Sequence, residues 1–237
     1  FEQARALGYL PEGQKLRNLH DYPVELEHPI TLKDGRQLLL SNNGLGLHLV
    51  VPADGSTPVR IKHPGTLASL IAPDGRWLIT SSYQAPGAKV WSLPEGRLLH
   101  TLCETESVTQ IVALGPDRVL LKVSGTGRLF LVHDWKQERQ LPASLRLNCL
   151  AATRDGRLLA TLDNHEIRLL ETTAFTEVLR LTFPAHIRWP GECHLVFDAE
   201  ARHLLAHTAL GSVCRWDLHQ MRGELKKLIS GDSLPSH

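Results

Sequence analysis

The chain has 237 residues, of which 42% are hydrophobic and 22% charged, proportions typical of a globular protein with a core of its own. They exclude a disordered tail and a collagen-like chain, and no apolar run approaches the ~18–20 residues that span a bilayer. The formal net charge of +1, from 26 basic and 25 acidic side chains, argues against a dedicated nucleic-acid or anionic-membrane binder. We therefore expect neither nucleic acid nor a membrane as a partner.

The N-terminal residue is Phe1 and the single methionine is Met221, so we expect a processed chain or a fragment. The four cysteines are 46, 44 and 21 residues apart, and no pair has the spacing of a zinc knuckle or a redox dithiol. The sequence contains no N-glycosylation acceptor and opens with no signal-peptide profile. The cysteine spacing favours a reduced, cytoplasmic setting.

One short sequence recurs five times along the chain. Each copy contains an arginine, and successive arginines are 40, 42, 39 and 45 residues apart: Arg36, Arg76, Arg118, Arg157 and Arg202. In three copies an Asp-Gly pair precedes the arginine, with Asp34, Asp74 and Asp155 as the aspartates. Asp-Gly favours a tight reversal, because glycine tolerates positive φ and aspartate can bond its own backbone. The even period predicts five structural repeats.

Each repeat has the same internal order of short apolar runs. One run precedes the turn and a second follows it. A third run comes next, at residues 47–50, 88–91, 129–132, 167–170 and 213–216, and a fourth closes most units. Four short strands every ~40–45 residues predict a β-propeller blade. No segment before residue 218 has a sustained helical period, so we expect an all-β propeller of four-stranded antiparallel blades.

Two tryptophans, Trp91 and Trp216, end equivalent third strands, and Asp217 follows the second of them. Together with the Asp-Gly-Arg turns, this pattern resembles the WD-repeat β-propeller family over nearly the whole chain. The full Trp-Asp pair is present only in the fifth unit. The Trp-Asp-Leu ending before a short helix resembles the C-terminal propellers of large bacterial, planctomycete-type WD-repeat proteins. That resemblance implies a kinase or sigma-factor region upstream.

Members of this family often carry a Gly-His pair before the first strand of a blade. His63, 11 residues before Asp74, is the best match, although the glycine is missing. The resemblance implies a buried His–Ser/Thr–Asp–Trp hydrogen-bond set in well-formed blades. We expect that set to be mostly absent here, so that apolar packing, at about 25 cal/mol per Å² buried, supplies more of the stability.

The repeat register divides the chain into one propeller spanning 1–237. Residues 1–27 are expected to end a preceding blade, because 11–19 parallels the outer-strand segment 94–102. The predicted units are 28–62, 63–104, 105–143, 144–184 and 185–218. A terminal helix is predicted at 219–229, where Met221, Leu225 and Leu228 recur on one face and Lys226 and Lys227 lie on the solvated side.

Two architectures fit this register. The first strand of the chain could complete the fifth blade and close a five-bladed ring. Alternatively, the blades form the C-terminal part of a larger ring, commonly of seven blades and ~290 residues. The missing initiator methionine favours the second architecture, and both stay open.

The sequence contains no recognisable catalytic, cofactor or metal site. His203 and His207 are four residues apart, which on one strand separates them by ~13 Å, too far to share a metal ion. No Gly-x-Ser-x-Gly elbow occurs, and Gly44-Leu45-Gly46 lacks the third glycine of a phosphate cradle. Asp34, Asp74 and Asp155 occupy the same place in successive units and are interpreted as turn residues. We expect no enzyme activity, with a propeller hydrolase or lyase using the central channel as the alternative.

Two loops, at residues 82–86 and 184–190, carry side chains of the types enriched at protein interfaces: Tyr83, Arg188 and Trp189. We predict that these residues bind a protein partner. In the alternative, Trp189 covers the edge of its own blade and Arg188 is solvated. The predicted function is a non-catalytic protein-interaction or scaffolding module of a larger signalling or regulatory protein. A purely structural role, with recognition by other blades, is a third possibility.

Overall fold

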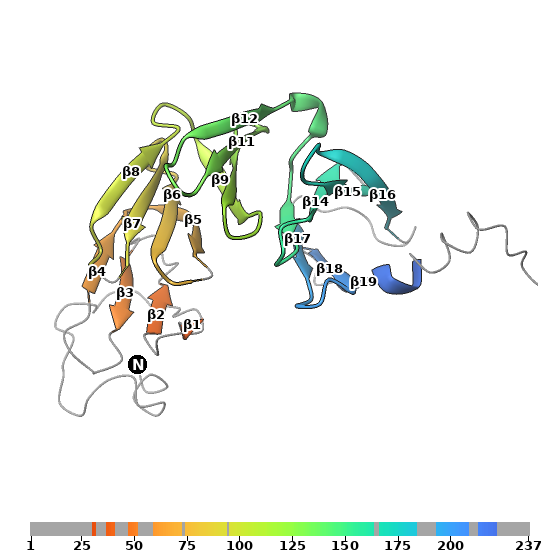
Figure 1. Cartoon of the computed structure of the whole chain (residues 1–237), viewed down its shortest axis with the longest axis horizontal. Coiled ribbons are helices and arrows are strands. Elements are labelled where there is room, and N and C mark those ends of the chain that lie inside the picture. Colours follow the sequence, from red (N-terminus) through yellow and green to blue (C-terminus); the bar gives the residue numbers. More distant parts are fainter. Residues whose placement is uncertain are drawn as a thin grey trace, which may run out of the picture. The chain divides into compact units, whose positions relative to one another are not determined.

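The computed structural model describes residues 30–31, 37–40, 47–51, 59–72, 74–93, 95–163, 166–183, 193–208 and 213–221. Throughout these ranges the regular structure is almost entirely short β-strands, and each sheet contains strands that are consecutive in the chain (Figure 1). Every strand pairs antiparallel with its neighbour, as hairpin connections require. The predicted all-β propeller with four-stranded antiparallel blades is confirmed.

The first two blades precede residue 103. The first contains β1 (Ile30–Thr31), β2 (Gln37–Leu40), β3 (Leu47–Val51) and β4 (Val59–Lys62). The second contains β5 (Thr66–Ile71), β6 (Trp77–Ser82), β7 (Ala88–Ser92) and β8 (Leu98–Leu102).

Three further sheets follow. The third blade contains β9 (Val108–Ala113), β10 (Arg118–Val123), β11 (Thr126–Leu131) and β12 (Gln137–Leu141). The fourth, after the short 3-10 helix η1 (Ala143–Leu145), contains β13 (Leu150–Ala152), β14 (Leu158–Asp163), β15 (Glu166–Glu171) and β16 (Thr176–Thr182). The fifth sheet has three strands in the described part of the chain: β17 (Cys193–Phe197), β18 (His203–Thr208) and β19 (Val213–Asp217).

A short C-terminal helix follows β19 at residues 218–221. The rest of the predicted helix, with Leu225, Lys226, Lys227 and Leu228, lies outside the described residues. Among the described residues no helix is long and apolar enough to span a bilayer.

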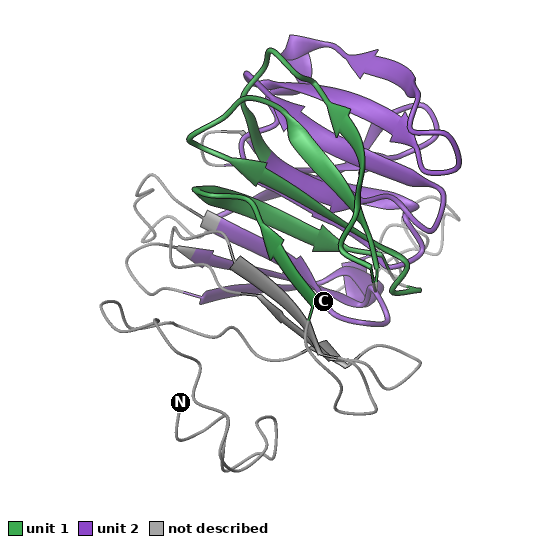
Figure 2. Ribbon diagram, turned by 90° about the vertical axis from the view of Figure 1, so that its left-hand side faces the viewer, with its two compact units in different colours: residues 1–109 green, residues 110–237 purple. Residues whose placement is uncertain are grey.

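The chain divides into two compact units, residues 1–109 and 110–237, and the division falls within β9 (Figure 2). In the first unit, a cluster of buried side chains joins β4 to the β5–β8 blade. It consists of Ile61, Leu78, Trp91 and Leu93. This packing removes the apolar faces of two consecutive sheets from water.

In the second unit both faces of the β13–β16 blade are buried. Leu159 and Leu170 pack with side chains of the β9–β12 blade, including Leu120 and Leu129. Because side chains alternate along a strand, Ala160 lies on the opposite face, where it joins the cluster shared with the β17–β19 sheet. Consecutive blades of this unit therefore pack face to face.

The turn between β13 and β14 is also packed closely against the preceding blade. Gly156 has φ +70°, and a Cβ atom there would lie 2.1 Å from the backbone N of Gly115 and 2.2 Å from the carbonyl C of Leu114. Real Cβ atoms do not approach backbone this closely. Glycine in the Asp155-Gly156 turn is thus required by its φ angle and by its backbone neighbours.

Candidate functional site

The Tyr83 loop, residues 82–87, connects β6 to β7 and carries the one predicted contact residue that the structure describes. Hydrogen bonds fix this loop from the segment before β5. The backbone N of Tyr83 donates to the carbonyl O of Gly65 at 2.9 Å, and the Ser82 hydroxyl donates to the carbonyl O of Pro64 at 2.6 Å. The same Ser82 oxygen accepts from the backbone N of Gln84 at 3.0 Å.

The other side of the Tyr83 loop is held by the segment after β8. The backbone N of Gly87 donates to the carbonyl O of Glu106 at 2.7 Å. Gly87 has φ +85°, and a Cβ atom there would lie 2.9 Å from the carbonyl O of Leu102. Gly65, with φ +69°, similarly has no room for a Cβ, because the Gln84 side chain would lie 2.6 Å from it. The loop is thus braced by both neighbouring segments of its own blade.

Tyr83 projects from this braced loop. Its side chain is 63% exposed, while Ser82 beside it is buried. The Tyr83 hydroxyl is 3.4 Å from the Gln84 amide N, which donates to it. The loop thus presents one large aromatic side chain to solvent on backbone that is already ordered.

A buried chain of polar side chains lies in the same β5–β8 blade. The indole Nε1 of Trp91 donates to the Thr80 hydroxyl at 2.8 Å, and Thr80 Oγ1 is 2.7 Å from Nδ1 of His63. The Thr80 hydroxyl can accept two hydrogen bonds and donate one, so the direction of its bond with Nδ1 depends on the imidazole tautomer. The other ring nitrogen of His63, Nε2, is buried and has no hydrogen-bond partner among the described residues.

The environment of His63 keeps its imidazole neutral. Burial, with a smaller contribution from the positive charge of Lys89, lowers the pKa of His63 from 6.5 to about 4. Lys89 itself lies over the Trp91 ring, with its Nζ 5.8 Å from the ring centroid. The positive charge of Lys89 disfavours protonation of the neutral His63 imidazole to the imidazolium form.

The expectation that the His–Ser/Thr–Asp–Trp set is mostly absent is therefore wrong for this blade. Three of its four members, His63, Thr80 and Trp91, are in place and hydrogen-bonded. Sequence reasoning identified His63 and Trp91 separately but missed Thr80. The signal that could have found Thr80 is its position on the second strand, between the two.

The aspartates of the repeat lie in separate turns. Asp74 accepts from the backbone N of Arg76 at 3.1 Å and also pairs with the Arg76 side chain. Asp155 accepts from the backbone N of Arg157 at 3.1 Å and from the Thr153 hydroxyl at 2.6 Å. Hydrogen bonds hold the pKa of the Asp155 carboxyl below its usual value, the bond from Thr153 contributing most. Both carboxylates thus stabilise their own turns; Asp34 lies outside the described residues.

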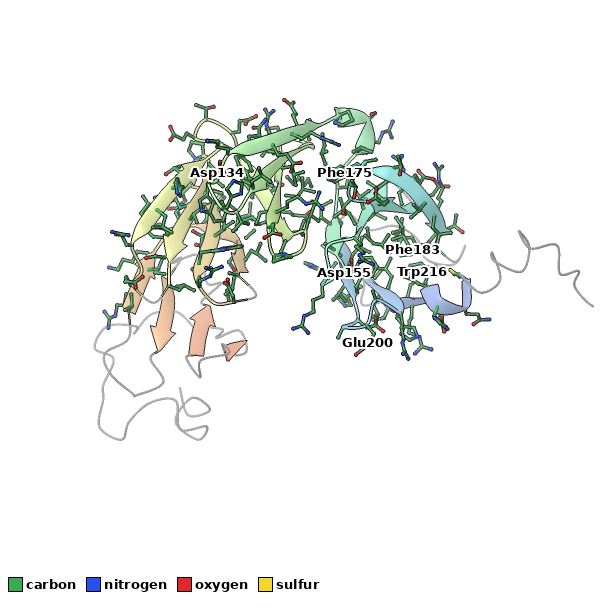
Figure 3. All side chains as sticks on the ribbon, viewed as in Figure 1. Asp134, Asp155, Phe175, Phe183, Glu200 and Trp216 are labelled. Carbon is green, nitrogen blue, oxygen red and sulfur yellow. The ribbon has the colours of Figure 1, made fainter. Side chains whose placement is uncertain are left out.

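The Trp-Asp pair of the fifth sheet has two distinct roles. Trp216 is 9% exposed and packs edge-to-face on Phe183, with ring centroids 5.2 Å apart (Figure 3). The Asp217 carboxylate accepts from the backbone N of Gln220 at 2.8 Å and so caps the terminal helix. That bond is the main cause of the lowered pKa of Asp217. The Trp-Asp pair therefore anchors the end of the sheet and starts the helix.

Of the three predicted contact residues the structure describes Tyr83, whereas Arg188 and Trp189 lie outside the described residues, so their place beside Tyr83 stays a prediction. In the part of the chain that is described, no group of three or more His, Cys, Asp or Glu side chains is arranged to hold a metal ion. Cys103, Cys149 and Cys214 are thiols and not half-cystines. Burial raises the pKa of the Cys214 thiol, which disfavours its reactive thiolate.

The chain was compared with known proteins. No family model matches it. No curated protein matches its sequence. The arrangement of small antiparallel sheets identifies a β-propeller, and that is the level of classification that these comparisons and the structure support together.

Proposed function

We propose that this chain is a WD-repeat-like propeller that acts as a non-catalytic protein-interaction module. The observation that carries the proposal is Tyr83, 63% exposed on a loop that hydrogen bonds hold from both sides. Tyrosine is enriched at interface hot spots, because it offers a large, rigid contact area with a polar tip. A loop that is already ordered loses little conformational entropy when a partner binds.

Other features of the same blade support a binding role. Leu67, two residues after Gly65, is 43% exposed, and Glu104, beside Gly87, is exposed. Exposed apolar and acidic residues thus occur in the two segments that hold the Tyr83 loop, where they are accessible to a protein partner. The repeat-type turns and the His63–Thr80–Trp91 chain support the WD-repeat-like assignment.

The wider setting belongs to the same proposal. By resemblance, the propeller serves a larger, cytoplasmic, multidomain regulatory protein of bacterial type, in which any catalytic step is carried out by another domain. The partner is a protein, and neither a nucleic acid nor a membrane.

Site-specific photo-crosslinking tests the proposal. A photoreactive phenylalanine analogue is placed at position 83 of the parent protein in its own cells, and at Val178 of β16 as the matched control. Val178 is 53% exposed and lies in the other compact unit. We expect one discrete adduct from position 83 and none from position 178. Equal adducts from both positions would contradict a specific contact at Tyr83.

A second arm uses affinity capture of the crosslinked partner. Tyr83→Ala should reduce its recovery at least fivefold without lowering the melting temperature, whereas Val178→Ala should leave recovery unchanged. Replacing Arg188 and Trp189 together by alanine should also weaken capture. If the partner is retained after Tyr83, Arg188 and Trp189 are all replaced, these blades are purely structural and recognition lies elsewhere in the parent protein.

A further inference from the structure

The β17–β19 sheet has one buried and one exposed face. Its buried face packs on the preceding blade through Leu195, Phe197, Leu204, Ala206, Cys214 and Trp216. On the other face, Val196 is 56% and Val213 is 61% exposed. His194, His207 and Arg215 are exposed on that same face. This face therefore presents two histidines to solvent, on adjacent strands.

The two histidines are direct cross-strand partners. The register of β17 against β18 pairs His194 with His207. Directly opposed residues of an antiparallel pair have Cβ atoms about 4.5–5.5 Å apart and point to the same face. That separation allows two imidazole rings to converge on one point. His203 and His207, which are neighbours in sequence, are in contrast ~13 Å apart along one strand.

We propose that His194 and His207 together bind one divalent d-block cation such as Zn²⁺, Ni²⁺ or Cu²⁺. Imidazole nitrogen is a preferred ligand of these ions, at about 2.0–2.1 Å for zinc. Two ligands fixed on paired strands need little ordering before they bind, and water completes the coordination shell. A site with two protein ligands agrees with the finding that no cluster of three or more ligating side chains occurs among the described residues.

Among the described residues next to this pair on the same face, these two side chains are the ones that can ligate a metal ion. Val213 lies opposite His207 on β19, and Val196 and Leu205 form the next cross-strand pair. None of these three side chains can ligate a metal. The carboxylates of Asp198 and Asp217 lie against His203 instead, with oxygens 2.7 and 3.7 Å from its ring nitrogens. Binding is therefore expected in the micromolar range, weaker than at a site with four protein ligands.

Calorimetric titration of the tag-free 237-residue chain with NiCl₂ tests the site. We expect one ion per chain, and at least tenfold weaker binding in either His194→Gln or His207→Gln. The matched control is His133→Gln, an exposed histidine outside the sheet whose side chain is 71% exposed. Its affinity should equal that of the wild-type chain. Equal losses in the control, or unchanged binding in both site variants, would show adventitious surface binding and overturn the proposal.

Thermal unfolding supplies a second readout, because two histidines fixed on paired strands bind an ion more tightly in the folded state than in the unfolded one. NiCl₂ should raise the melting temperature of the wild-type chain and of His133→Gln, and should leave both site variants unchanged. The melting temperature of each protein in the presence of a chelator is the reference from which its own nickel-dependent shift is measured. A nickel-dependent shift that persists in His194→Gln and His207→Gln would place the ion elsewhere.

Discussion

Trp91 and Trp216 occupy the same place in two blades, and their surroundings differ. Each is 9% exposed. In the β5–β8 blade, Thr80 on the second strand accepts the indole N–H of Trp91. In the β17–β19 sheet the corresponding residue is Ala206, which offers no side-chain acceptor, and Trp216 packs on the edge of Phe183. The same arrangement of strands thus accommodates the buried tryptophan either with a hydrogen-bonding neighbour or with an aromatic one.

The polar surroundings of Trp91 and the apolar surroundings of Trp216 have different consequences for stability. The polar blade contains a buried imidazole, His63, whose Nε2 has no hydrogen-bond partner among the described residues, a cost of about 1–3 kcal/mol. Within the described residues of the β17–β19 sheet, no buried side-chain N or O atom lacks a partner, and the sheet relies on close packing against the preceding blade. The stability of the polar blade should therefore fall when the Thr80 hydroxyl is removed or the pH is lowered. The stability of the apolar unit should fall when a side-chain atom is added to its closely packed interior.

The largest effect is expected in the apolar unit, from Gly156→Ala. The new methyl group would lie 2.1 Å from the backbone N of Gly115, and the residue would keep a φ of +70°. We expect a loss of about 5 kcal/mol or more in the free energy of unfolding, measured by urea denaturation. Gly125→Ala is the control, because Gly125 has φ +81° and a methyl group there would have no neighbouring atom within 4 Å. It should lose only about 1–2 kcal/mol; equal losses would show that φ alone matters.

In the polar blade, Thr80→Val should cost about 4 kcal/mol. Valine has the same shape but leaves the indole N–H of Trp91 and Nδ1 of His63 buried without their partner. Thr161→Val is the matched control in the other unit. Thr161 is equally buried, on the equivalent strand, and its hydroxyl makes a 3.3 Å bond to the carbonyl O of Arg146. Its loss should be about 1 kcal/mol, and similar costs for both would remove the energetic distinction between the two blades.

The polar blade should also lose stability as the pH falls from about 6.5 to about 4. The pKa of His63 is about 4 in the folded chain, against 6.5 for a solvated imidazole, so between these values the unfolded state binds more protons. The full contribution, about 3 kcal/mol, is present above pH 6.5 and is lost on reaching pH 4. Urea denaturation at several pH values measures it. His63→Gln should flatten the curve over this interval; an unchanged slope would assign the titration to other groups.

Much of the fold was predictable because it depends on local chemistry. The turns at Asp74 and Asp155 need an aspartate oxygen and a residue that tolerates positive φ, and both requirements are visible in the sequence. Strand order followed, because short turns can join only antiparallel neighbours. The period of the turns then predicted the blades.

The rest depends on which residues meet across strands, and spacing along the chain does not reveal that. Thr80 became significant only when pairing placed it between His63 and Trp91. The pairing of His194 with His207 depends on the register of β17 and β18, which join through a turn without an Asp-Gly-Arg sequence. Residue type alone identified Tyr83 as a candidate contact. The hydrogen bonds by which Gly65 and Glu106 hold its loop could not be predicted from the sequence.

The smallest change in the free energy of unfolding is expected in the β17–β18 turn, which differs from the equivalent turns of the second and fourth blades. Ala201 has φ +53°, in the place where the second and fourth blades have Gly75 at +73° and Gly156 at +70°. In all three turns this residue donates its backbone N–H to the carbonyl O three residues earlier. A left-handed conformation costs an alanine about 1 kcal/mol, so Ala201→Gly should stabilise the chain by about 0.5 kcal/mol after the entropy gained by the unfolded state is subtracted.

Ala152→Gly in β13 is the control, because a strand residue gains nothing from glycine and should lose about 0.5–1 kcal/mol. Urea midpoints of the two variants should therefore move in opposite directions from the wild-type value. If both midpoints fall, the left-handed alanine carries no cost that glycine relieves. The fifth turn would then be held by the bonds from the backbone N of Arg202 and of His203 to the Asp198 carboxylate, at 2.7 and 3.1 Å, which do not depend on the residue at position 201.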